Sequence, residues 1–401
     1  ALSSTLMGVR QEGGLPRLTL LFKPYVEDLH DRWQTNGRDV WPCVDAPWPR
    51  AAFRGHNPGK LFIYLARQTV CVVGIGWSNR AESTAEMLMA GILEIHDALA
   101  AASPQPAAFR FREFGRVVEI NLHDAYERRP HRLAPATDLA YACKHVDPRG
   151  CDVGLVPHFI FGNYMEVGIG EFPAVSRRLA AAGNQPARQR LCAWVGNRRN
   201  HEQRARFIER AAKLPELFAS PPTDQYISLR AQVEEWACLV DLVGFGFSAR
   251  LPLLLHSARV VLKVTSPAPG PWLWYENPWA FPEALTPWKH FVPVHANLSD
   301  LVEKAMWIKD HPRESDQIGL AGQAYARRYL TRRRASEYLA RQVLIAGQCR
   351  GRSFSNGSMC SYDWVKSSVK RHSQLINQSF WAGLLEGLMR ANVQTPFPLV
   401  V

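Results

Sequence analysis

The sequence predicts an α/β protein of two doubly wound, Rossmann-like domains that face each other across a cleft. Two observations favour this class: short apolar or β-branched runs alternate with longer amphipathic runs, and they do so in two separate groups. A polar stretch, residues 183–190, joins the groups, and 401 residues are enough for two cores. We therefore expect an N-terminal domain over residues 1–178, a C-terminal domain over 179–348, and an unassigned tail over 349–401.

The first domain is expected to begin its sheet with strands at residues 61–65 and 70–75. An amphipathic helix follows, whose apolar side chains recur at helical spacing: Ala85, Leu88, Ile92, Ile95 and Leu99. The glycines at 74 and 76 suggest a dinucleotide-binding turn, but Asn79 stands where that motif needs a third glycine. We therefore do not expect an NAD or FAD enzyme.

Asp124 is a candidate catalytic residue. It comes directly after residues 116–122 (RVVEINL) and His123, and the run RVVEINL predicts a buried strand. Open α/β sheets bind ligands just beyond the carboxyl ends of their strands, which is where this carboxylate would lie. The alternative is an aspartate that only shapes a turn.

The second domain is expected to begin with a strand at 191–195, a turn at Gly196 and Asn197, and a helix at 200–214. A further apolar run, 239–243, ends at Gly244 and Gly246, and a helix over 251–255 and a strand over 260–264 follow. Arg250 stands where that helix begins. A glycine turn with exposed backbone N–H groups and an arginine suits an anion, although an ordinary turn with a surface arginine is the alternative.

A later helix carries an apolar stripe of Ile318, Ala321, Tyr325 and Tyr329. We expect it to end the second domain and to cross back to the first.

Composition and charge limit the function. With 47% hydrophobic and 21% charged residues, the chain is unlike a collagen, a coiled coil or a disordered protein. No apolar run approaches 18 residues, so no transmembrane helix is predicted, and the start at Ala1 is compatible with removal of a signal or anchor segment. The net charge of +12 fits either a nucleic-acid binder or an enzyme of anionic substrates. Because the cationic residues are spread along the chain, we favour the enzyme.

The phrases GFGFSAR, SARVVLKV, LTPWKHFVPV, NLSDL and IGLAGQAYARRYL occur in an order and spacing that resembles glycosyltransferase family 90. The resemblance is best over residues 191–330. It implies the two-domain GT-B architecture and an inverting transfer of xylose or glucose from UDP-xylose or UDP-glucose to a hydroxyl of a glycan or protein. The alternative is a non-catalytic relative that binds glycans or acts as a scaffold.

The resemblance also implies roles for single residues. Asp124 would be the catalytic base. The residues expected to bind the UDP-sugar are Asn197, Arg204, Phe245, Gly246, Phe247, Ser248, Ala249 and Arg250. Arg198 or Arg199 could take the place of Arg204. Val195 stands where many members carry a basic residue. No Asp-x-Asp occurs in the chain, so we expect no metal and no other cofactor, with arginines as the counter-charge of the diphosphate.

The resemblance implies a secretory-pathway protein, or a cytoplasmic one if the source is bacterial. The cysteines do not follow the family: its pair beside the nucleotide motif falls on Glu234 and Ser257. Cys143 and Cys151 could close a small loop through a disulfide, and a metal between them is conceivable because His145 lies in the loop. As partners we expect the donor and an acceptor, no nucleic acid and no second subunit.

Overall fold

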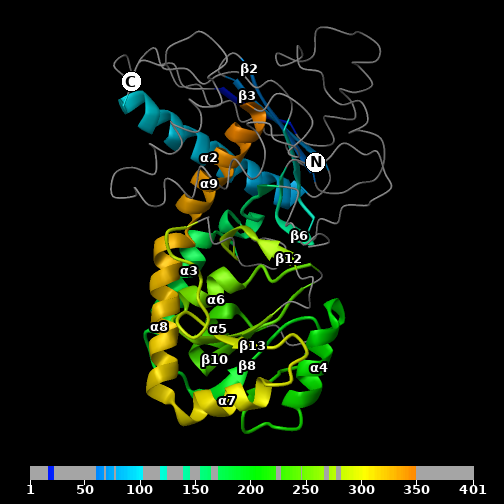
Figure 1. Cartoon of the computed structure of the whole chain (residues 1–401), viewed down its shortest axis with the longest axis vertical. Helices are drawn as coiled ribbons and strands as arrows, with labels where there is room; N and C mark the ends of the chain where they lie inside the picture. Colours follow the sequence, from blue (N-terminus) through cyan, green and yellow to red (C-terminus); the bar gives the residue numbers. More distant parts are fainter. Residues whose placement is uncertain are drawn as a thin grey trace. The chain divides into compact units, whose positions relative to one another are not determined.

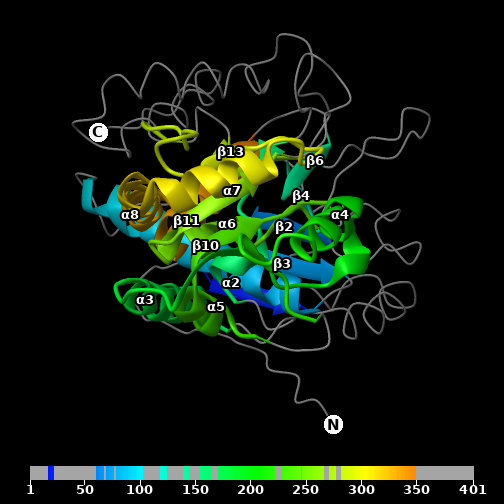
Figure 2. The ribbon, with the colours of Figure 1, turned by 90° about the horizontal axis from the view of Figure 1, so that it is seen from below.

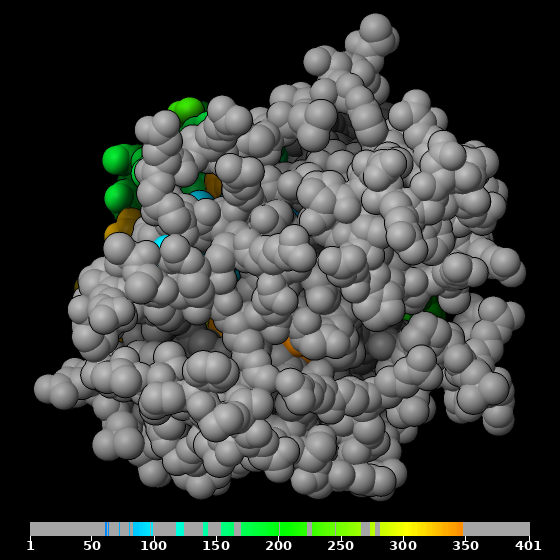
Figure 3. Space-filling view, turned by 90° about the horizontal axis from the view of Figure 1, so that it is seen from above, coloured from blue at the N-terminus to red at the C-terminus, as the bar shows by residue number. Residues whose placement is uncertain are grey.

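The computed structural model has two units, each with its own sheet. Figures 1 and 3 show the chain coloured by position in the sequence. The described residues are 17–21, 60–66, 69–75, 78–102, 118–123, 139–144, 154–163, 170–222, 227–244, 246–265, 271–276 and 281–348. The first unit takes its residues from Ala1–Cys143, Arg149–Gly162 and Arg333–Val401, and the second from Lys144–Pro148 and Asn163–Arg332. The boundary after residue 178 stays a prediction; helix α3 (Phe172–Gly183), which contains that position, packs on other helices of the second unit.

The sheet of the first unit has the order β1-β3-β2-β4-β5-β7. The strands are β1 (Arg17–Leu21), β2 (Lys60–Ala66), β3 (Thr69–Ile75), β4 (Val118–Asn121), β5 (Leu139–Ala140) and β7 (Gly154–Leu155). The short β6 (Ala142–Lys144) follows β5 along the chain. The sheet is mixed, because β2 runs antiparallel to both β3 and β4 while the other pairs are parallel. An all-parallel, doubly wound sheet would lack such a strand, so β2 is where this unit departs from that pattern.

Helix α2 (Ser78–Ala102) forms the core of the first unit together with α9 (Arg332–Gln348). Ala85, Leu88, Ile92 and Ile95 are buried, which confirms four positions of the expected stripe. Gly91 lets α9 come close: a Cβ there would lie 2.0 Å from the Ser336 carbonyl oxygen, so no larger residue fits. The chain thus returns to the first unit after the second, but through α9 rather than through the helix that carries residues 318–329.

The sheet of the second unit is parallel throughout, with the order β13-β11-β10-β8-β9. Its strands are β8 (Gln189–Ala193), β9 (Phe218–Ala219), β10 (Trp236–Asp241), β11 (Val260–Val264) and β13 (Val292–Val294). All six residues of the central β10 are buried, the usual composition of a strand covered on both faces. The remaining elements are a short strand, β12 (Pro271–Leu273), and three 3-10 turns, η3 (Phe159–Phe161), η5 (Arg198–Asn200) and η6 (Trp274–Glu276).

Helices cover both faces of this second sheet. Helix α7 (Leu301–Asp310) lies on one face, and α3 and α5 (Leu229–Glu235) lie on the other, as Figure 2 shows. Helix α6 (Leu251–His256) and helix α8 (Pro312–Tyr329) pack on each other and on β11, while α4 (Glu202–Ala211) follows β8. This arrangement is Rossmann-like. In the part of the chain described, no helix has the length and apolar character needed to cross a bilayer.

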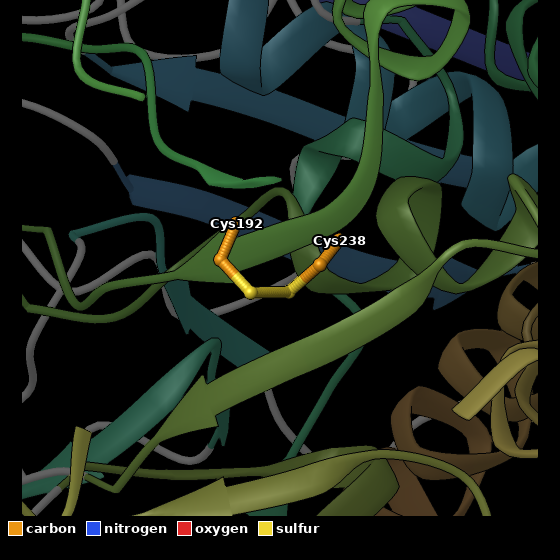
Figure 4. Close-up of a disulfide and its surroundings, with 2 residues drawn as sticks. All are labelled: Cys192 and Cys238. Carbon is orange, nitrogen blue, oxygen red and sulfur yellow. A yellow bond between two sulfur atoms is a disulfide. The ribbon is translucent and has the colours of Figure 1, made fainter. Parts of the chain in front are cut away.

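A disulfide joins the two strands at the centre of the second sheet (Figure 4). Cys192 of β8 and Cys238 of β10 are paired residues in the strand register, their Cα atoms are 4.3 Å apart, and both side chains are buried. This pair was not predicted from the sequence. Glu234 and Ser257, where the family's cysteines would fall, bond instead to Arg230 and to the Leu254 carbonyl. The Cys143–Cys151 suggestion lies outside the described side chains, as does His145.

Candidate functional site

The candidate site lies where β8 and β10 end. Because the two strands are parallel neighbours, the loops that follow Ala193 and Asp241 leave the sheet at the same edge. The sequence places an arginine after each loop: Arg204 in the first turns of α4, and Arg250 directly before α6. These are the two arginines that the sequence analysis selected.

The side chain of Arg204 joins the two loops. Its Nε donates to the Val243 carbonyl at 2.8 Å, in the loop after β10. Its Nη1 donates to the Asn197 carbonyl at 3.0 Å, in the loop after β8. A planar guanidinium held at two points has few rotamers left, so its charge has a defined position. The structure therefore brings Arg204 and Asn197 together.

Arg250 reaches across from the opposite side. Its Nη1 donates to the Val195 carbonyl at 2.7 Å, so the loop after β8 contacts both arginines. The bond uses the backbone of Val195, and any residue at that position would offer the same carbonyl. Both guanidinium groups also lie near the ring of Trp194, with Cζ at 5.3 Å for Arg204 and 5.9 Å for Arg250.

The loop after β10 is a tight turn. The Gly244 N–H donates to the Phe247 carbonyl at 3.1 Å, and a Cβ at Gly244 would lie only 2.7 Å from that oxygen. Gly246 and Ala249 are half-buried and Phe247 is buried, while Phe245 lies outside the described residues. Helix α6 is only six residues long, so its dipole is small and the arginines supply most of the positive charge.

Asp241 lies at the same edge of the sheet and was not among the residues predicted from the sequence. It ends β10 with 3% of its surface exposed and accepts a hydrogen bond from the Ser248 hydroxyl. Burial raises the pKa of its carboxyl, while that bond and the charges of Arg250, Lys263 and Arg204 act in the opposite direction. The Ser248 hydroxyl proton is thereby directed at Asp241. The sequence pattern that could have identified Asp241 is an aspartate at the end of an apolar strand, as in ACLVD.

Helix α4 is anchored at its start. The His201 ring caps it by accepting from the Gln203 N–H at 3.2 Å. The Gln203 side chain donates to the carbonyls of Thr265 and Ala296, which follow β11 and β13, at 3.1 and 2.7 Å. Four strands thus end around this segment.

Two alternatives to Arg204 lie elsewhere in the loop after β8. Arg198 and Arg199 are exposed in η5, where the Arg199 N–H donates to the Asn197 side chain at 2.9 Å. Arg204 is the arginine of this segment that contacts Trp194 and the loop after β10.

Asp124 lies outside the described residues, although the strand leading to it is described. The first three residues of strand β4 are buried, and the carbonyl of Leu122, which follows the strand, accepts from Arg80 of α2 at 3.2 Å. Arg80 also lies over the Phe159 ring at 4.6 Å. Nearby His158 is fully buried, and burial followed by the charge of Arg80 lowers its pKa to about 3. The described part of the aromatic segment 155–172 is therefore mainly core.

In the described part of the chain, no group of three or more His, Cys, Asp or Glu residues could hold a metal ion. His290, which the motif LTPWKHFVPV contains, is buried beside Tyr325 with ring centroids 4.7 Å apart. It precedes β13, at the amino end of the sheet and opposite the arginines.

The described residues form an α/β protein in which two arginines lie at one edge of the second sheet. The family model for glycosyl transferase family 90 matches residues 141–345, about half of the chain, and the chain belongs to that family.

Curated relatives agree with this assignment. The chain is 44% identical over 91 residues to protein O-glucosyltransferase 2 of Danio rerio, which is 23% of this chain and 16% of the relative. It is 30% identical over 148 residues to protein O-glucosyltransferase 3 of Homo sapiens, which is 34% of this chain and 27% of the relative. To protein O-glucosyltransferase 3 of Mus musculus it is 40% identical over 88 residues, covering 22% of this chain and 16% of the relative. The chain thus matches less than a third of each relative's length.

Proposed function

We propose that this protein transfers glucose or xylose from a UDP-sugar to a hydroxyl of a protein or glycan, with inversion at the anomeric carbon. The observation that carries the proposal is the pair of arginines held at one edge of the second sheet. Arg204 lies at the start of α4 and Arg250 directly before α6, and both contact the segment 194–197. Two fixed guanidinium groups suit a diphosphate, which has two negative centres and oxygens for a planar fork. The relatives are named protein O-glucosyltransferases, which supports glucose as the sugar.

The reaction assigns a separate task to each group. The acceptor oxygen attacks the anomeric carbon, and the bond from that carbon to the β-phosphate oxygen breaks with its electron pair leaving on UDP. The arginines stabilise the charge that develops on the diphosphate. Asp124 takes the acceptor's proton; an aspartate near its reference pKa is ionised at neutral pH and can do so without a large shift.

The disulfide supports a location for this reaction. Cys192 and Cys238 are bonded to each other inside the second sheet, and such bonds persist mainly in oxidising compartments. We therefore propose that the protein acts in the lumen of the secretory pathway.

A panel of nucleotides tests the donor. We expect UDP, UDP-glucose or UDP-xylose to raise the melting temperature, by an amount equivalent to roughly 2.7 kcal/mol at a hundredfold excess over Kd. GDP is the matched control because it carries the same diphosphate on a purine. Equal protection by GDP would mean that the site binds diphosphates without selecting uridine. Protection by UDP without any transfer or hydrolysis of a UDP-sugar would favour the non-catalytic relative.

Asp124→Asn tests the base. Asparagine has nearly the same shape but cannot accept the acceptor's proton, so transfer should fall by about 10²- to 10⁴-fold. UDP affinity and the melting curve should stay close to those of the unsubstituted protein. Transfer at an undiminished rate would move the base elsewhere, and the neighbouring His123 would be the first candidate.

A further inference from the structure

We propose that Trp194 is a positioning residue whose indole ring holds the guanidinium groups of Arg204 and Arg250 in place for the diphosphate. This inference rests on the proposed function, since it concerns the same edge of the sheet. Trp194 is the first residue after β8 and has 1% of its surface exposed. A side chain so buried has no direct access to a ligand in this arrangement, so its effect passes through the arginines.

The ring lies beside both cations. The Cζ atoms of Arg204 and Arg250 are 5.3 and 5.9 Å from the centroid, within the range in which a cation is attracted to an aromatic face. Two like charges at one site repel each other, and a shared electron-rich ring offsets part of that repulsion. Trp194 can therefore lower the cost of keeping both arginines at the edge before the diphosphate binds.

The backbone next to the ring completes the arrangement. A Cβ at Gly196 would lie 2.8 Å from Cζ2 and 3.2 Å from Cη2 of Trp194, so the loop lies directly against the indole. The carbonyls on either side of that glycine are those that bond the arginines: Val195 accepts from Arg250 and Asn197 accepts from Arg204. The ring therefore supports the loop as well as the charges. Displacing the indole would disturb the ring's contacts with the guanidinium groups and the bonds from the arginines to the two carbonyls together.

Packing alone does not account for a tryptophan here. The ring meets Phe207 edge-on, with centroids 6.3 Å apart, a contact that phenylalanine could also make. The indole Nε1 is buried and has no acceptor within the described part of the chain. An unpaired buried N–H is unfavourable, and phenylalanine would avoid it. The larger and more electron-rich indole has its advantage in the contact with the two cations.

Trp194→Phe and Trp194→Leu separate the packing role of the ring from its contact with the two cations. Trp236→Phe is the matched control, since Trp236 is also buried but lies at the amino end of β10, away from the arginines. By isothermal titration with UDP we expect the Kd to rise roughly tenfold in Trp194→Phe and further in Trp194→Leu, and by less than about twofold in the control. Melting curves should show Trp194→Phe at least as stable as Trp236→Phe.

A second measurement does not depend on UDP. The Nε–H signals of ¹⁵N-arginine-labelled protein, assigned with Arg204→Lys and Arg250→Lys, report how rigidly each guanidinium is held. In Trp194→Phe we expect both signals to shift and their heteronuclear NOE to fall, while Trp236→Phe leaves them unchanged. Unchanged signals, or an unchanged Kd for UDP in Trp194→Phe, would overturn the positioning role. A protein that fails to bind UDP while its arginine signals respond would instead contradict the proposed function.

Discussion

Replacing Arg250 by alanine should weaken UDP binding far more than removing a charge of the second unit that lies away from the two site arginines. Arg250 is half-buried, bonds to the Val195 carbonyl at 2.7 Å and lies over Trp194. Its position is therefore set before any ligand arrives, so little ordering is needed when a phosphate binds. Removing it takes away a positive charge that is already in place.

The size of the effect follows from this position. A unit charge pair at about 4 Å near a protein surface is worth roughly 4 kcal/mol before desolvation. After desolvation a charge-assisted hydrogen bond keeps about 1.5–3 kcal/mol, so the Kd for UDP should rise by roughly 10- to 150-fold. The Kd of Arg250→Lys for UDP should lie between that of the unsubstituted protein and that of Arg250→Ala, because lysine keeps the charge but lacks the planar fork.

The assay is isothermal titration with UDP, accompanied by melting curves. Arg230→Ala is the matched control: it removes the same charge from α5, where Arg230 is exposed and pairs with Glu234 at 2.7 Å. That change should alter the Kd by less than about twofold, since exposed ion pairs contribute little. If Arg250→Ala bound UDP normally, Arg250 would not contact the diphosphate. If Arg230→Ala were equally impaired, the loss of binding would come from net charge and not from a contact of Arg250.

Three further predictions concern the same site. Sugar transfer should persist in excess EDTA, and its loss on chelation with recovery on adding magnesium or manganese would show that arginines alone do not stabilise the leaving group. Burial and the charge of Arg204 lower the pKa of His201 in the folded protein. The stabilisation by its neutral ring is therefore fully present above the unfolded pKa near 6.5, and it is lost as the pH falls through the lower folded pKa. His201→Asn keeps a cap on α4 but does not titrate, so its melting temperature should depend less on pH between 7 and 5; an equally steep dependence would assign the effect to another group. Gly244→Ala should weaken UDP binding and cost about 1–3 kcal/mol of stability, because its Cβ would lie 2.7 Å from the Phe247 carbonyl and 3.4 Å from Arg204; unaltered binding and melting would mean that the turn relaxes freely.

Several elements were predictable because their signals are local. Strand β11 has the bounds expected from its β-branched run, and β4, β8, β10 and α4 differ from expectation only at their ends. The strands β9 and β13 were missed, since runs of two or three residues carry no readable period. The antiparallel placement of β2 was missed as well, because pairing direction depends on neighbours rather than on the strand's own residues.

By itself the sequence determined the order of strand, turn and helix that places Arg204 after β8 and Arg250 after β10, because periodicity and backbone freedom act over a few residues. Only the tertiary structure decided that both arginines meet the ring of Trp194, that Cys192 faces Cys238, and that Asp241 is buried beside Ser248. The disulfide and the contact of Arg250 with Trp194 depend on the register of β8 against β10, and a shift by one residue would turn every side chain of the shifted strand to the other face. Register is set by packing across the whole sheet, so no local pattern in the chain contains it.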